Sequence, residues 1–292
     1  MTLRADNPSV SLTAVQLPFT GEPLGTLYFG KHGIKLEVIY FYLEKEGVSA
    51  VANQAFSRTE SMLGREAMEK LSRSHIAVFG LGGVGSWAAE SLCRAGVGTL
   101  TLIDSDTISE TNLNRQLYAL RSTVGLPKAE VAAARCRDIN EAVTVHPIVG
   151  TYDAAHREDF FGAQYDYIVD CIDLVSCKLD LIEQAQARGI PILTALGTGN
   201  KRDASQFTVT DISKTYGCPL ARIMRKELRQ RDIHHLKVVF SPEEPQETVQ
   251  TEAPPPGRRS VPSSVSWVPA SAGLLMAQTV VEDLIAKGGE GK

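Results

Sequence analysis

The sequence predicts an α/β fold, a Rossmann-like, doubly wound and mainly parallel sheet flanked by helices, with a C-terminal extension of mixed strands and helices. Short apolar runs alternate with longer helical patterns through most of the chain. The glycine-rich turn GLGGVG joins one apolar run to a helical pattern. An acid, Asp104, follows roughly 20 residues later at the end of the next apolar run. Together these features indicate βαβ units with a ligand site at the carboxyl edge of the sheet.

The predicted elements alternate in type along the chain. The expected helices cover residues 61–72, 86–95, 128–140, 178–188, 219–230 and 272–286. The expected strands cover residues 76–79, 99–104, 144–148, 167–170, 192–195, 206–210 and 237–240. Strands separated by helices of this length pair in parallel, because right-handed crossover connections return the chain to the same edge of the sheet.

The chain is expected to divide into an extension and one large domain. Residues 1–52 are an N-terminal extension that remains unassigned, with strand-like runs at 26–29 and 34–43, and residues 53–292 form the domain. Within it, residues 241–259 are acidic and rich in proline, which predicts a mobile insertion because such a segment buries little apolar surface. The uncharged residues 260–281 are interpreted as a folded terminal segment rather than a membrane span.

Composition excludes several classes of protein. With 292 residues, 43% hydrophobic and 22% charged, the chain can bury a full core and is neither fibrous nor wholly disordered. A net charge of −4 requires any nucleic acid to bind a local basic patch. The five cysteines are scattered and never spaced C-x-x-C, so the sequence predicts no disulfide framework, no stable zinc site and a reducing cytoplasm.

The glycine turn predicts a bound phosphate, but it leaves two enzyme classes open. Backbone N–H groups at the start of a helix hold anions, and a carboxylate at the end of the next strand binds a ribose diol. Asp104 stands at that position. A nicotinamide cofactor and ATP both fit this pattern. The glycines of the turn are Gly80, Gly82, Gly83 and Gly85.

The residues that follow Asp104 favour ATP. Asn112, Arg115 and Gln116 lie in a polar turn, and Lys128 begins the next helical pattern. ATP carries about four negative charges, which require cationic side chains and a divalent metal. The run YIVDCID brings Asp170 and Asp173 to the same edge, where a carboxylate can hold Mg²⁺. Taken singly, each of these residues could be a helix cap or part of a surface ion pair. Their occurrence together, in this order along the chain, favours a bound nucleoside triphosphate.

Several motifs resemble the ubiquitin-activating-enzyme-like adenylyltransferase superfamily, which includes the bacterial activators of the sulfur carriers for molybdopterin and thiamine. The motifs GLGGVGS, DSDTISETNLNRQ, VGLPK and DCID carry the resemblance over residues 56–199. It implies that residues 53–292 form an ATP-binding, adenylyltransferase-like domain in which Asp173 ligates Mg²⁺. It also implies a homodimer in which Arg58 reaches the partner's ATP. The implied ATP contacts are Gly80, Gly82, Gly83, Gly85, Asp104, Asp106, Asn112, Arg115, Gln116 and Lys128, and the implied catalytic residues are Arg58, Arg115, Lys128 and Asp173.

The sequence after residue 193 is similar to the tRNA threonylcarbamoyladenosine dehydratase branch of that superfamily. This resemblance implies adenylation and cyclisation of the threonyl carboxylate of threonylcarbamoyladenosine in tRNA, with release of AMP and pyrophosphate. It implies a cytoplasmic enzyme, with peripheral membrane association left open, and a sulfur-transfer protein as a further candidate partner. One alternative is activation of the C-terminal glycine of a ubiquitin-like sulfur carrier. The other is a non-catalytic or NAD-binding Rossmann protein.

A basic helical pattern provides a candidate surface for tRNA. Its cations are Arg222, Arg225, Lys226 and Arg229, with Lys201, Arg202, Lys214, Arg231 and Lys237 nearby in sequence. Such a stripe can follow phosphates, and a merely solvated helix face is the alternative. Tyr216 is the nearest aromatic candidate for stacking a base, and His234 and His235 are expected at the surface. Cys218 is the one candidate nucleophile among the cysteines, with an inert thiol as the alternative.

Overall fold

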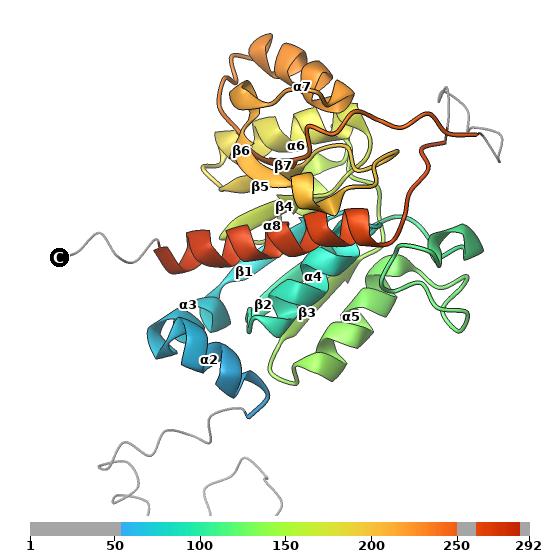
Figure 1. Cartoon of the computed structure of the whole chain (residues 1–292). Helices are drawn as coiled ribbons and strands as arrows, with labels where there is room; N and C mark the ends of the chain where they lie inside the picture. The colour runs from blue at the N-terminus through green and yellow to red at the C-terminus, as the bar shows by residue number, and fades with distance from the viewer. Residues whose placement is uncertain (1–53, 250–260, 287–292) are drawn as a thin grey trace, which may run out of the picture. The chain divides into compact units, whose positions relative to one another are not determined.

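The computed structural model describes residues 54–249 and 261–286 (Figure 1). The expected extension at residues 1–52, with its two strand-like runs, lies outside the described residues, as do residues 250–260 of the expected insertion. The first part of that insertion is described and is bonded to the domain. Glu243 accepts the backbone N–H groups of Arg202 and Asp203, and the buried Lys201 ammonium donates to the carbonyl of Ser241 over 3.0 Å.

A seven-stranded sheet forms the centre of the domain, in the order β3-β2-β1-β4-β5-β7-β6. Every pair is parallel except β6 with β7, which is antiparallel. This confirms the predicted mainly parallel sheet. The strands are β1 (His75–Phe79), β2 (Thr99–Ile103), β3 (Thr144–Ile148), β4 (Tyr167–Asp170), β5 (Ile192–Ala195), β6 (Thr208–Asp211) and β7 (Lys237–Phe240).

Helices cover both faces of the sheet, as Figure 1 shows. The helices are α2 (Ser57–Leu63), α3 (Arg65–Arg73), α4 (Gly85–Arg94), α5 (Lys128–Ile139), α6 (Val175–Ala187), α7 (Pro219–Arg229) and α8 (Trp267–Ala286). Successive side chains of a strand point to opposite faces. Ile76 and Val78 of β1 therefore pack in a buried cluster with α4, α5 and α8, whereas Ala77 and Phe79 pack in a second cluster with α6 and α7.

Four predicted elements differ from the structure by more than one residue, and one of them is α6, which begins at Val175, three residues before the expected start at 178. The helix expected over residues 61–72 is two helices, α2 and α3, separated by Gly64, whose φ of 87° is accessible mainly to glycine. The strand expected at 206–210 begins only at Thr208, because residues Ala204–Gln206 form a 3-10 turn that the side chain of Asp203 caps. Helix α8 begins at Trp267, five residues before the expected start at 272.

Helix α8 packs against the domain core. Ala272, Met276 and Val280 are fully buried, and a Cβ on Gly273 would lie 2.4 Å from the Val84 carbonyl oxygen at the start of α4. The glycine thus allows close approach of the two helices. Helix α8 is also long and apolar enough to cross a membrane, but half of its most apolar stretch is buried against the rest of the protein.

The strand order places the site. β1 and β4 lie side by side, and the connection that leaves β1 runs to β2 on one side, whereas the connection that leaves β4 runs to β5 on the other. In open parallel sheets, ligands bind in the crevice outside the carboxyl ends of the strands at such a reversal. The turns that follow β1, β2, β4 and β5 all meet at this edge.

Candidate active site

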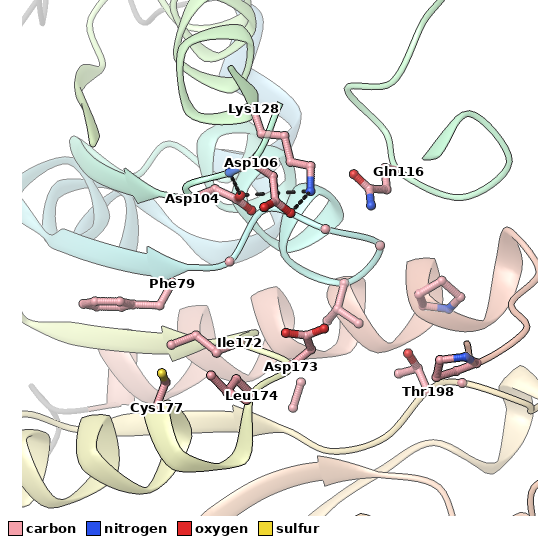
Figure 2. A pocket seen from close by; sticks show the side chains of 18 of the residues that line it. Phe79, Asp104, Asp106, Gln116, Lys128, Ile172, Asp173, Leu174, Cys177 and Thr198 are labelled. Carbon is pink, nitrogen blue, oxygen red and sulfur yellow. Dashed lines mark hydrogen bonds and ion pairs between the residues drawn. The ribbon is translucent and has the colours of Figure 1, made fainter. Parts of the chain in front are cut away.

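A cavity of about 660 Å³ lies at the predicted edge of the sheet. Its walls come from the turns after β1 to β5 and from residues that precede and begin α8. Figure 2 shows a close view of this cavity. The sequence-predicted residues that line it are Gly80, Gly82, Gly83, Asp104, Asp106, Asn112, Arg115, Gln116, Lys128 and Asp173.

The glycine turn is shaped by close backbone approach. Gly80 has a φ of 86°, and a Cβ there would lie 2.8 Å from the Cys171 carbonyl oxygen after β4. A Cβ on Gly85 would lie 1.8 Å from the Gly80 carbonyl oxygen, so Gly85 allows α4 to begin directly at the turn, and it does not itself line the cavity. Gly82 and Gly83 present their backbone at the cavity, near the positive end of the α4 dipole.

Asp104 is held in a fixed orientation beside the turn. Its two carboxylate oxygens accept the N–H of Leu81 over 2.6 Å and the N–H of Asp106 over 2.8 Å. Burial raises the pKa of Asp104, while the nearby Lys128 ammonium and these two N–H donors oppose the rise. A carboxylate with both oxygens at the cavity wall can accept hydrogen bonds from a ribose diol.

Lys128 is buried with its charge directed at acids of the cavity. Its ammonium lies 2.8 Å from Asp106 Oδ2 and 4.0 Å from Asp104 Oδ1, and only 5% of the residue is exposed (Figure 2). A buried ammonium requires such partners. The Asp106 carboxylate is itself two-thirds exposed, so a bound phosphate can share the Lys128 ammonium with it.

The polar turn after β2 has both structural and site roles. Asn112 is buried and accepts the N–H of Ser109 in a capping box. It therefore has the capping role that the sequence left open as an alternative to ligand binding. Arg115 donates from Nη1 to the Thr111 carbonyl over 2.8 Å and to Asn114 Oδ1 over 2.9 Å. Its Cγ lies 3.6 Å from where a Cβ on Gly83 would be. The arginine therefore lies beside the glycine turn.

The two acids of YIVDCID have different environments. Asp173 is exposed and lines the cavity, and Figure 2 shows it apart from the Asp104–Lys128 cluster. Asp170, expected at the same edge, is fully buried and lies 2.9 Å from the ammonium of Lys178, which is also fully buried. Lys178 donates to the Ile172 carbonyl over 2.9 Å, and Asp170 Oδ1 accepts the Ile172 N–H. This buried pair fixes the turn that carries Asp173.

Residues that sequence reasoning missed form the far part of the cavity. We call the group Leu196–Gly199, Leu220, Pro262 and Ser264 the acceptor wall. Its first part follows β5, so the rule that located Asp104 and Asp173 could have found it, as it could Gly150–Tyr152 after β3. Cys177 also lines the cavity, and burial raises the pKa of its thiol. No sequence signal pointed to Pro262 or Ser264.

Residues 261–266, here called the cover segment, are bonded to both sides of the cavity. Ser263 forms two hydrogen bonds with Asn200, its N–H donating to Asn200 Oδ1 over 2.7 Å and its carbonyl accepting the Asn200 N–H over 2.8 Å. Asn114, whose Oδ1 binds Arg115, donates to the Ser264 carbonyl over 3.0 Å. The cover segment thus connects the polar turn to the loop that follows β5, and it contributes Pro262 and Ser264 to the acceptor wall.

Two predicted site residues lie away from the cavity. Arg58 is exposed on α2 and does not line the cavity of its own chain. The prediction that it acts in a partner's site stays a prediction. Cys218 is 3% exposed and also does not line the cavity, an environment typical of an inert thiol. All five cysteines lie in the described residues and are free thiols.

The basic surface is narrower than the sequence suggested. Arg222, Lys226 and Arg229 are exposed on α7, but Arg225 is partly buried and donates to the Thr215 carbonyl over 2.7 Å. Of the nearby cations, Lys201 is buried, Arg231 pairs with Glu183 and Glu227, and Lys237 pairs with Asp283. His234 and His235 are exposed, as predicted.

Comparisons with known proteins agree with this geometry. The model of the ThiF family matches residues 56–291, which contain every residue of the cavity. A tRNA threonylcarbamoyladenosine dehydratase of Bacillus subtilis is 41% identical over 239 residues, covering 79% of this chain and 94% of that relative. A molybdopterin-synthase adenylyltransferase of Escherichia coli is 33% identical over 153 residues, covering 52% of this chain and 61% of that relative. The structure of E. coli tRNA N6-threonylcarbamoyladenosine dehydratase in complex with ATP matches with a TM-score of 0.75 and 34% identity, covering 84% of this chain and 99% of that one.

Proposed function

We propose, from the premise that this chain belongs to the ThiF family, that it is an ATP-dependent tRNA threonylcarbamoyladenosine dehydratase. The relative that is 41% identical carries this name, and the E. coli dehydratase of similar fold binds ATP. The proposed reaction activates the threonyl carboxylate of the modified adenosine and closes it into a ring. AMP and pyrophosphate are the other products.

One observation carries the proposal. A single cavity combines a glycine turn, an oriented acid, two cations and a second acid, and then continues past them to the acceptor wall. The volume of about 660 Å³ is within the range of small-molecule sites. A protein that only binds a nucleotide needs the glycine turn and the charged residues around it. An enzyme that transfers the adenylyl group of ATP to a carboxylate also needs room for that second reactant, which the acceptor wall provides.

Each residue then has a role that its geometry permits. Backbone N–H groups of Gly82 and Gly83 hold phosphate oxygens, and Asp104 accepts the ribose hydroxyl groups. Lys128 and Arg115 neutralise negative charge that shifts onto the leaving pyrophosphate, which makes them the main contributors to adenylation. Asn112, Gln116 and Asp106 complete the walls around the polyphosphate.

The described residues fit a magnesium ion held jointly with ATP. They contain no group of three or more His, Cys, Asp or Glu side chains that could hold a metal alone. Mg²⁺ in nucleotide sites is bound by one or two carboxylates together with phosphate oxygens and water. Asp173, exposed at the cavity, would be that carboxylate. The ion would supply positive charge to the phosphates during transfer.

The chemistry has two steps. A carboxylate oxygen of the substrate attacks the α-phosphorus of ATP, and the bond from that phosphorus to the bridging oxygen breaks to release pyrophosphate. A nucleophile of the same threonylcarbamoyl group then loses its proton and attacks the acyl carbon, which expels AMP and closes the ring. Tethered reactants gain effective molarities of about 10⁵ M or more, so no external nucleophile or catalytic cysteine is required.

The remaining features of the assembly are part of the same proposal. The tRNA backbone contacts Arg222, Lys226 and Arg229 of α7, which are exposed together on one helix. Two copies associate so that Arg58 of one reaches the ATP of the other. A sulfur-transfer protein is a candidate partner, and the proposed location is the cytoplasm, with peripheral membrane association through α8 as the alternative.

The decisive test is mass spectrometry of nucleosides from tRNA that carries threonylcarbamoyladenosine, after incubation with the protein, ATP and Mg²⁺. We expect a product lighter by one water, and AMP in equal amount. Omission of ATP is the control. A complete absence of the dehydrated nucleoside, with active ATP binding, would contradict the proposal.

A second candidate is suggested by the 33% identity to the molybdopterin-synthase adenylyltransferase. In that case the acceptor wall would receive the C-terminal glycine of a ubiquitin-like sulfur carrier. Exchange of labelled pyrophosphate into ATP separates the two candidates. Exchange that requires modified tRNA supports the dehydratase, and exchange that requires a carrier protein supports the alternative.

A further inference from the structure

Two aromatic side chains are exposed on the described part of the chain, and both belong to segments that adjoin the acceptor wall. Phenylalanine, tyrosine and tryptophan residues in residues 54–249 and 261–286 are buried or partly buried except Tyr216, which is 65% exposed, and Trp267, which is 53% exposed. A single exposed aromatic residue is ordinary on a protein surface. Two on segments that adjoin the same loop, with no other exposed in these ranges, indicate a shared role.

Trp267 is fixed to the loop that forms the acceptor wall. Its indole Nε1 donates to the Arg202 carbonyl over 2.8 Å, and it directly follows the cover segment, whose Ser264 lines the cavity. The same loop includes Gly199, where a Cβ would lie 2.7 Å from Pro262 Cβ. Since the polar N–H is satisfied inside the protein, the exposed part of this side chain is an apolar ring held in one orientation.

Tyr216 is linked to the same loop through the end of β7. Its ring meets the buried ring of Phe240 edge to face, with centroids 5.9 Å apart. Phe240 precedes Ser241, whose carbonyl accepts the Lys201 ammonium. Two residues after Tyr216, the sulfur of Cys218 lies 3.8 Å from where a Cβ on Gly197 would be. Neither ring lines the cavity itself, but both are carried by segments that contact the loop of the acceptor wall, where the substrate of the proposed reaction would enter.

We infer that Trp267 and Tyr216 form a base-stacking site for single-stranded RNA at the rim of the acceptor wall. This inference rests on the proposed function, since it identifies what the rim recognises. A modified base reaches an enclosed site only after leaving its stack, which costs a few kcal/mol. Aromatic side chains offset that cost because every base has a π face, and they hold the splayed strand beside the cavity.

The test is the affinity for tRNA carrying threonylcarbamoyladenosine, measured with Trp267→Ala, Trp267→Phe, Tyr216→Ala and Tyr216→Phe. Loss of stacking on one ring weakens binding by about 5- to 150-fold, so we expect losses in this range for the alanine variants and near wild-type affinity for the phenylalanine variants. Leu274→Ala is the matched control, because Leu274 is 48% exposed on the same helix two turns later.

Two further readouts distinguish lost stacking from misfolding and from lost charge attraction. For Tyr216→Ala, the ATP affinity without RNA is expected to equal that of the wild type, and the melting temperature to fall by no more than about 6 °C, because one ring contact with Phe240 is lost. Stacking is largely insensitive to salt, so the dependence of affinity on salt should keep its slope in the aromatic variants. Should Trp267→Ala fail to fold, the Tyr216 pair and Trp267→Phe still decide the question.

The inference is overturned if both alanine variants bind tRNA as tightly as the wild type, or if Leu274→Ala loses as much affinity as they do. It is also overturned if the alanine variants impair pyrophosphate exchange that depends on a carrier protein, since the rim would then recognise a peptide. A wild-type protein that dehydrates the nucleoside while its alanine variants bind normally would leave the proposed function standing and remove only the stacking site.

Discussion

The buried ion pair between Asp170 and Lys178 gives a prediction whose size follows from the structure. Replacing Lys178 with Met removes the ammonium and leaves the Asp170 carboxylate without its charged partner. Both side chains are fully buried, 2.9 Å apart. At an effective dielectric constant of about 20, unit charges at that distance attract by about 6 kcal/mol. The net cost of removing one partner is smaller, about 3–5 kcal/mol, because the wild type already bears part of the desolvation cost.

The expected loss of stability is large for a domain of this size. With about 2–4 °C per kcal/mol, Lys178→Met should lower the melting temperature by roughly 6–20 °C. The double variant Asp170→Asn with Lys178→Met should recover most of this, because removing both charges also removes the desolvation cost. Urea unfolding of the single and double variants measures the coupling between the two side chains.

The pKa of Asp170 predicts how the stability difference between Lys178→Met and the wild type changes with pH. Burial raises the pKa of Asp170, an effect that Lys178 opposes. Without Lys178, the folded-state pKa rises further above the unfolded value, so the folded state binds the proton more tightly. Protonation then stabilises the variant at low pH, and that stability is lost as pH rises through the folded-state pKa. The gap between variant and wild type should therefore narrow as pH falls. A constant gap, or a double variant no more stable than Lys178→Met, would refute the reasoning.

The other predictions concern activity and binding. Arg115→Ala or Asp173→Ala should lower the rate of AMP formation by at least about 100-fold, while the circular dichroism spectrum and the melting temperature remain those of the wild type. Normal AMP formation by either variant would contradict the assigned roles. Lys226→Glu with Arg229→Glu should weaken tRNA binding and reduce the steepness of its salt dependence, and unchanged affinity at low salt would remove α7 from the tRNA surface. The pKa of Asp104 is raised by burial, and ribose binding needs the ionised carboxylate. The ratio of ATP affinities between wild type and Asp104→Asn should thus be constant above that pKa and fall as pH drops through it; a ratio independent of pH would argue against a ribose contact.

The sequence alone was sufficient for the elements that carry a strong periodic pattern and for one half of the cavity. Strands β3, β4, β5 and β7 have their predicted bounds, and in β4, β5 and β7 short apolar runs between turn residues mark the buried strands. The glycine turn, Asp104 and Lys128 meet as expected because the ends of adjacent parallel strands share an edge.

What escaped prediction depends on contacts between distant parts of the chain. Asp170 and Asp173 look equivalent in sequence. Asp170 is buried in the core because Lys178, one helical turn into α6, supplies the charge that pairs with it. The acceptor wall draws on residues 196–199, 220, 262 and 264, and no local pattern links such separate segments. Arg225 likewise shares the helical spacing of its neighbours but is held by the Thr215 carbonyl.

Pro269 at the start of α8 contacts Gly83 of the glycine turn, with a Cβ on that glycine 3.1 Å from Pro269 Cβ. Two residues that are nearly 200 positions apart in the sequence thereby lie together in the wall of the cavity. During synthesis, a nascent chain that ends before residue 261 already contains the glycine turn and Asp104, but it lacks the cover segment and the helix that buries α4. The pocket therefore stays incomplete on the ribosome until α8 has emerged, and a nucleotide finds its complete binding surface only then.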